Sequence, residues 1–154
     1  MTTQPRTLKS IFGRRLGIGA YGQLVAQGIN ISQPAVDAAI LISAEGATTG
    51  DTRDITITLK DAQGNAIDYA ENFEIVMYSS SAMTDFVAAG GSTGVQQGAT
   101  GKLLAVVAKK LFACITSTSG AWAGSYLDTG TAAGYLAVRL PNGRVIGGGT
   151  VTNA

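Results

Sequence analysis

The stretch GIGAYG, residues 17–22, spells Gly-x-Gly-x-x-Gly, the glycine spacing with which dinucleotide-binding enzymes approach a pyrophosphate. That chemistry needs a strand before the glycines and a helix that begins at them, because the positive end of the helix dipole meets the phosphates. The preceding IFGRRL is too short and too basic for a buried parallel strand, and Gly28 and Pro34 interrupt any helix that follows. We therefore interpret the three glycines as flexible joints and predict no dinucleotide cofactor.

The remaining side chains offer little catalytic chemistry. The chain contains no His and a single Cys, Cys114, which excludes Ser-His-Asp and Cys-His machinery, His-based metal sites and thiolate clusters. Cys114 lies in an apolar run, so we expect a buried free thiol rather than a nucleophile or a disulfide. We predict that the protein is not an enzyme and that it holds no metal or cofactor.

Two other arrangements stay open. Asp51, Asp54 and Asp61 would hold Ca²⁺ through their oxygens if a strand end gathered them, although carboxylates in turns more often cap those turns. Trp122 and Tyr126 would stack on a sugar ring if they were exposed. Large aromatic residues four positions apart in a strand more often pack on one core face, which is the interpretation we favour.

From about residue 37 the chain alternates apolar and polar residues with the period of two that half-buried strands require. Short strands with turn residues between them predict an all-β protein, an antiparallel β-sandwich. The expected strands are DITITLK (54–60), NFEIVMY (72–78), AWAGSYL (121–127), GYLAVRL (134–140) and VIGGGTVT (145–152), with 102–117 forming either one long bent strand or two shorter ones. The core is expected to contain Ile55, Ile57, Leu59, Phe73, Ile75, Met77, Leu136 and Val138.

Turn chemistry separates these strands. In the turn DAQGNA, Asp61 is placed to close an Asx-turn, and Gly64 and Asn65 to supply positive φ. In PNGR (141–144), Pro and Asn-Gly suit a tight hairpin. Residues 79–101 are rich in Gly, Ser and Thr and are expected to form a long loop.

Charge divides the chain in two. Charged residues make up only 14% of it, against about 25% in typical soluble proteins. Four basic and no acidic side chains precede Asp37, whereas seven basic and ten acidic side chains lie from Asp37 onward. We predict an extended basic N-terminal arm over 1–36 and one β-sandwich domain over 37–154. A sparsely charged surface suits coverage by neighbouring subunits, and a small, weakly charged soluble domain is the alternative.

The basic arm suits an acidic protein surface. Its four charges are spread over ten positions without aromatic residues interleaved at stacking distance, which is a weak nucleic-acid signal, so we expect no nucleic-acid partner. No stretch approaches the roughly 18 apolar residues that span a bilayer, and the N-terminus lacks the apolar run of a secretory signal. We therefore expect no membrane partner and synthesis in a reducing cytoplasm.

Three segments of the chain resemble segments of a known class of β-domain. ITITLKDAQGNAI, TSTSGAW and GYLAVRLPNGRV resemble the strand-and-turn cadence of bacterial and phage Ig-like domains, over about residues 54–152. The arm IFGRRLGIGAYGQLV followed by such a domain is similar to small structural proteins encoded among the head genes of tailed phages. This resemblance implies a capsid decoration, or cement, protein on the virion surface, made in the host cytoplasm, whose partner is the major capsid protein.

The resemblance also implies where binding lies. We expect Ile11, Phe12 and Leu16 to bury against the capsid shell, and Arg14 and Arg15 to pair with carboxylates there. We expect a homo-oligomer, with a trimer favoured. The alternative function is a phage tail, fibre or adhesin module that binds a receptor or glycan.

Overall fold

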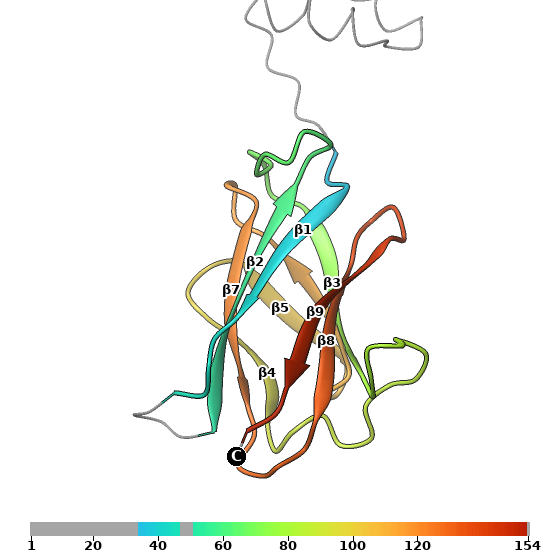
Figure 1. The fold of residues 1–154 in the computed structure, drawn as a ribbon. Helices are drawn as coiled ribbons and strands as arrows, with labels where there is room; N and C mark the ends of the chain where they lie inside the picture. The colour runs from blue at the N-terminus through green and yellow to red at the C-terminus, as the bar shows by residue number, and fades with distance from the viewer. Residues whose placement is uncertain (1–33, 47–50, 154) are drawn as a thin grey trace, which may run out of the picture. The chain divides into compact units, whose positions relative to one another are not determined.

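The computed structural model describes residues 34–46 and 51–153, which form two antiparallel sheets packed face to face (Figure 1). The predicted antiparallel β-sandwich is confirmed. One sheet has the strand order β1-β2-β7-β4 and the other β5-β6-β3-β8-β9. The strands are β1 (Asp37–Ile42), β2 (Thr52–Lys60), β3 (Asn72–Tyr78), β4 (Gly94–Gln97), β5 (Lys102–Val107), β6 (Leu111–Ile115), β7 (Ala121–Leu127), β8 (Gly134–Arg139) and β9 (Val145–Val151). Apart from residues 34–36, the arm predicted for 1–36 lies outside the described residues.

The core lies between the sheets and follows the alternation in the sequence. Ile55, Ile57 and Leu59 of β2 have no exposed surface. Ile57 is the register partner of Trp122 on β7, whose ring meets the edge of Phe73 from the other sheet, with centroids 6.3 Å apart and planes 80° apart. All eight predicted core side chains are buried, because successive side chains of a strand point to opposite faces.

Both predicted turns form. The Asp61 carboxylate accepts hydrogen bonds from the backbone N–H groups of Gln63 and Asn65, each at 2.9 Å. Gly64 has a φ of 85° and Gly143 a φ of 84°, a region that residues without a Cβ adopt without strain. Asn65, which was expected to share the positive φ, does not have one.

The segment 79–101 differs from its prediction as one long loop, because it contains β4, which pairs with β7. The sequence of β4, GVQQ, has a single large apolar residue and no alternation to reveal it. The segment 102–117 forms two strands, the second of the two predicted possibilities, since the chain reverses at Lys109 with a φ of 62°.

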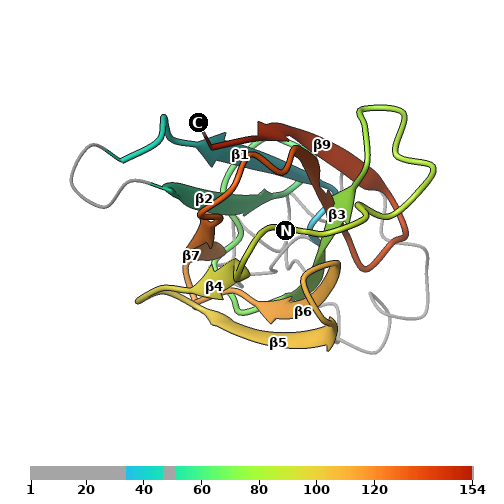
Figure 2. The ribbon, with the colours of Figure 1, turned by 90° about the horizontal axis from the view of Figure 1, so that it is seen from below.

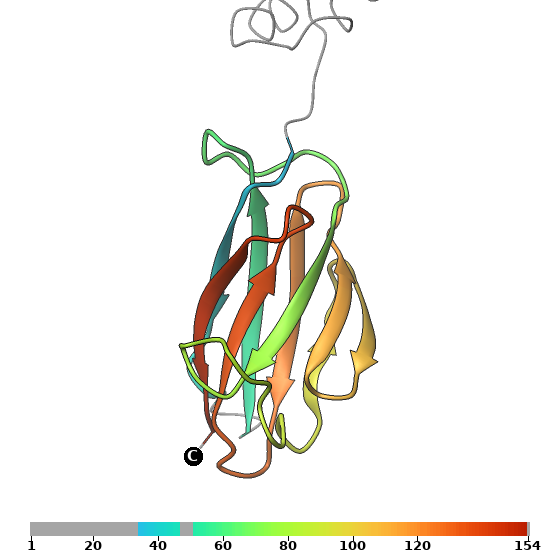
Figure 3. The same ribbon diagram turned by 90° about the vertical axis from the view of Figure 1, so that its right-hand side faces the viewer.

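The order of strands in space follows the variable-type Ig domain, in which an ABED sheet faces a GFC sheet extended by two further strands. The path of the chain differs between β3 and β7. It leaves β3 for β4 in the opposite sheet, and only then adds β5 and β6 beside β3. Figure 3 looks onto the outer face of the five-stranded sheet, with β9 at one edge and β5 at the other.

Candidate interaction surface

The residues expected to bind a partner, Ile11, Phe12, Arg14, Arg15 and Leu16, lie outside the described residues, as does GIGAYG. Their roles stay predictions. The surfaces that the structure shows belong to the β-sandwich, and they include features that the sequence interpretation did not single out.

The three aspartates considered for Ca²⁺ do not gather. Asp51 and Asp54 lie at the start of β2, whereas Asp61 follows its last residue. A nine-residue extended strand separates the two ends. Within residues 34–46 and 51–153, no three His, Cys, Asp or Glu side chains lie close enough together to hold a metal ion.

Trp122 and Tyr126 are core residues and offer no stacking platform. Neither has exposed surface. The Trp122 Nε1–H donates to the carbonyl oxygen of Lys102 at 3.2 Å, so the polar atom of the indole ring is satisfied inside the sandwich. The interpretation as core side chains is confirmed.

Exposed apolar side chains gather on β5. Five large apolar side chains are exposed in the described part of the chain, and three of them, Leu104, Val106 and Val107, belong to this strand. Leu104 is 69% exposed and Val106 56%. β5 is an edge strand that pairs only with β6 among the described strands. We call these three side chains the β5 patch; clusters of this kind mark interaction surfaces when they are contiguous.

Two hollows lie on the same sheet, and the smaller of them borders the β5 patch. The smaller, of 210 Å³, borders Leu104 and has Ala113 of β6 in its wall. The larger, of 530 Å³, extends from Ala113 past Glu74 and Arg139 to Pro141. Ala113 is the register partner of both Leu104 and Glu74, so its small side chain leaves room between larger neighbours.

The charges around this face are unevenly placed. Arg139 of β8 donates to the Glu74 carboxylate of β3, and the two form an ion pair across the sheet. Between Asp85 and Asp128 the sequence has three lysines and no acidic residue. Lys102 lies at the start of β5, and Lys109 and Lys110 lie in the turn that joins β5 to β6.

The backbone edge of β5 is less available than its outer face. Leu103 N–H donates to the Gln97 side-chain oxygen at 3.1 Å. The register also shifts between Ala105 and Val107. The bonded Leu103 N–H and the irregular register discourage pairing with a further strand. The exposed side chains of the outer face are therefore the part of β5 most accessible to a partner.

The signal for the β5 patch was present in the sequence. KLLAVV has five consecutive apolar residues where a half-buried strand would alternate. In an edge strand with one face on the core, such a run necessarily exposes part of its apolar side chains.

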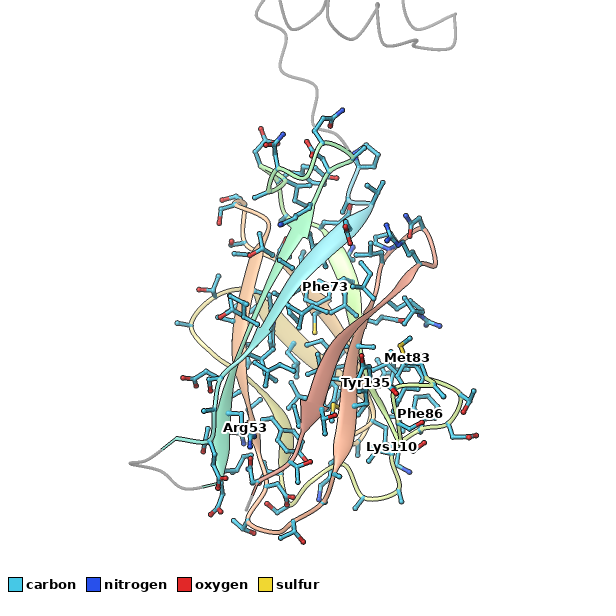
Figure 4. The ribbon with its side chains drawn as sticks, in the orientation of Figure 1. Arg53, Phe73, Met83, Phe86, Lys110 and Tyr135 are labelled. Carbon is cyan, nitrogen blue, oxygen red and sulfur yellow. The ribbon has the colours of Figure 1, made fainter. Side chains whose placement is uncertain are left out.

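A second group of side chains, which are aromatic, lies farther along the same sheet. The rings of Tyr78 and Phe86 stack with centroids 6.4 Å apart and planes 10° apart, and Phe86 is 50% exposed. Tyr78 is the register partner of Tyr135 on β8. Figure 4 shows Phe86 and Tyr135 on the same side of the sandwich.

Cys114 is a buried free thiol, as predicted. Chiefly because burial disfavours the thiolate, the pKa of Cys114 is raised from 9.0 to about 12. Burial likewise raises the pKa of the Tyr126 hydroxyl. The thiol is therefore protonated and unreactive at neutral pH.

Raising the pH above about 9 is expected to destabilise the fold, because the folded state holds protons that the unfolded chain releases there. For Cys114 the stabilisation is complete below its unfolded pKa of 9.0 and is lost progressively toward its folded pKa of about 12. Urea unfolding at several alkaline pH values measures the slope, at most about 1.4 kcal/mol per pH unit for each such group. Cys114→Ala should reduce this slope, and an unchanged slope would contradict the assignment.

No protein-family model, curated protein or solved structure matches this chain. The structure contains no helix, over the residues that it describes, long and apolar enough to cross a membrane.

Proposed function

We propose that this chain is a structural component of a tailed-phage particle, a capsid decoration protein that binds the major capsid protein and stabilises its lattice. The observation that carries the proposal is the division of the chain into a basic N-terminal segment and a sparsely charged β-sandwich. The unit that contains the β-sandwich begins at Gln33, so the four basic side chains that precede Asp37 also precede this unit. The sandwich itself is sparsely charged and has an exposed apolar patch. A compact domain that follows a basic peptide segment suits adhesion to a much larger, acidic protein surface.

The N-terminal segment supplies the contact in this proposal. Ile11, Phe12 and Leu16 bury against the shell, and Arg14 and Arg15 pair with carboxylates around them. Apolar burial provides most of the binding free energy, because charge pairs at the rim of an interface chiefly fix register and speed association.

Deleting residues 1–20 is expected to leave the sandwich folded but to weaken its binding to capsids assembled without this protein. The core of the sandwich lies entirely within the unit that begins at Gln33, so circular dichroism and urea unfolding should be unchanged. Co-sedimentation with the capsids measures binding. Full binding by the shortened chain would show that the sandwich alone makes the contact.

A charge-reversal pair sharpens this test. Arg14→Glu with Arg15→Glu should weaken binding, most strongly at low salt, where exposed charges are screened least. Lys109→Glu with Lys110→Glu changes the net charge by the same amount within the sandwich and serves as the matched control. Equal losses in the two double variants would indicate a general charge effect instead of a contact by the arm.

A second candidate function is a tail or fibre module that binds a glycan. The stacked Tyr78–Phe86 pair favours it, because a half-exposed aromatic ring can pack against the apolar face of a sugar. Cryo-electron microscopy of the phage separates the candidates, since a decoration protein lies on the icosahedral shell and an adhesin lies on the tail.

A further inference from the structure

Two exposed leucines lie on different outer faces of the sandwich. Leu41 of β1 and Leu104 of β5 are each 69% exposed. The neighbours of Leu41, Ile40 and Ile42, pack against the core, so Leu41 points outward from the four-stranded sheet. Figure 2 shows β1 and β5 at opposite sides of the sandwich. Leu41 and Leu104 therefore cannot contact each other within one copy of the domain.

The surroundings of the two leucines are complementary in shape. Leu41 has Thr56 as its register partner on β2, and Thr56 in turn has Ala123 on β7. Because these neighbouring side chains are small, the Leu41 side chain protrudes beyond them. Leu104, in contrast, borders the 210 Å³ hollow formed where Ala113 leaves space. A protruding aliphatic side chain and an apolar hollow of this kind fit together.

Their charges are complementary as well. Asp37 lies on the same face of β1 as Leu41, and Asp54 lies two residues before Thr56 on the same face of β2. Lys60 is the register partner of Asp37 and shares this face, so two carboxylates and one ammonium group lie around Leu41. The face therefore carries one net negative charge. Lys102 shares the outer face of β5 with Leu104, two residues away.

We propose that copies of this chain associate head to tail, with Leu41 of one copy inserted into the hollow beside Leu104 of the next. The acidic side chains around Leu41 then face Lys102 across the contact. Because the two patches are different surfaces, each copy retains one free patch of each kind, and the assembly grows until a ring closes. The expected trimer is one such ring. The contact does not involve residues 1–20. Self-association is therefore tested independently of the proposed binding to capsids.

The full chain is therefore expected to self-associate, and Leu41→Ser and Leu104→Ser should each weaken association about tenfold or more, since each removes a buried leucine from the contact. Sedimentation velocity over a range of concentrations measures this. Both leucines are exposed in the single chain, so neither change should alter the urea unfolding of the domain.

A mixture of the two variants gives the decisive measurement. Leu41→Ser keeps the Leu104 hollow, and Leu104→Ser keeps Leu41, so an equimolar mixture should form a one-to-one dimer and no larger species. Phe86→Ser, which removes another half-exposed apolar side chain, is the matched control and should associate like the unaltered chain.

Three results would overturn the proposal. One is an unaltered chain that stays monomeric at its highest soluble concentration. Another is a Leu41→Ser chain that associates normally while Leu104→Ser does not, because this indicates a two-fold contact between β5 patches. The third is a mixture of the two variants that forms no dimer.

Discussion

Replacing Trp122 with Ala is expected to lower the free energy of unfolding by about 3–5 kcal/mol, the largest effect of any single core substitution in this domain. Trp122 is fully buried, meets Phe73 edge-on and donates a hydrogen bond to the Lys102 carbonyl. Two glycines border its ring and cannot fill the space it leaves: a Cβ on Gly124 would lie 2.4 Å from Cη2 of the ring, and one on Gly101 2.5 Å from Cδ1.

Urea unfolding followed by circular dichroism measures this loss. Trp122→Phe is the matched comparison, because it keeps an aromatic ring against Phe73 but removes the Nε1–H donor. We expect its cost to be clearly smaller than that of Trp122→Ala. A loss below about 1 kcal/mol for Trp122→Ala would mean that the two sheets do not close on this side chain.

Replacing Asp128 with Ala is expected to cost about 3 kcal/mol, because it removes one buried carboxylate that serves three backbone donors. The carboxylate accepts from the N–H groups of Ser92 at 2.8 Å, Gly130 at 3.1 Å and Ala132 at 3.0 Å. Asp128 is 2% exposed, so those donors would lose their partner in a site with little access to water.

Asp85→Ala is the control for this prediction. Asp85 is exposed, and its carboxylate bonds the neighbouring Thr84 hydroxyl, so its removal should change stability by no more than about 0.5 kcal/mol. Equal effects of the two substitutions in urea unfolding would show that the Asp128 bonds contribute nothing beyond those of a surface carboxylate.

The two-residue alternation of apolar and polar side chains was sufficient to predict the strands that form most of the core. β2, β7 and β8 alternate between apolar and polar or small residues, so the buried face can be identified before any partner is known. β3 alternates up to Ile75 but continues with the apolar and buried Val76 on its other face. The turn after β2 was also predictable, since the Asp61 carboxylate bonds within its own turn. Local chemistry of this kind does not depend on the rest of the fold.

β4 shows where local information ends. The apolar and polar residues of β4 alternate too little to predict a strand. The segment forms a strand because its backbone pairs with that of β7. Gly94 illustrates the same dependence. Its φ of 85° and the closeness of the Gly90 carbonyl, 3.0 Å from where a Cβ would lie, are properties of the folded loop.

The sequence by itself determined the fold class, the buried faces of the long strands, the buried Cys114 and the segregation of basic residues before Asp37, because each follows from residue type and short-range spacing. Only the tertiary structure decided which sheet each strand joins, that Asp61 lies far from Asp51 and Asp54, and that β5 is an edge. Its position at the edge turned an ordinary apolar run into the exposed β5 patch. The physical reason is that the exposure of a side chain depends on which segments, distant in the sequence, cover it.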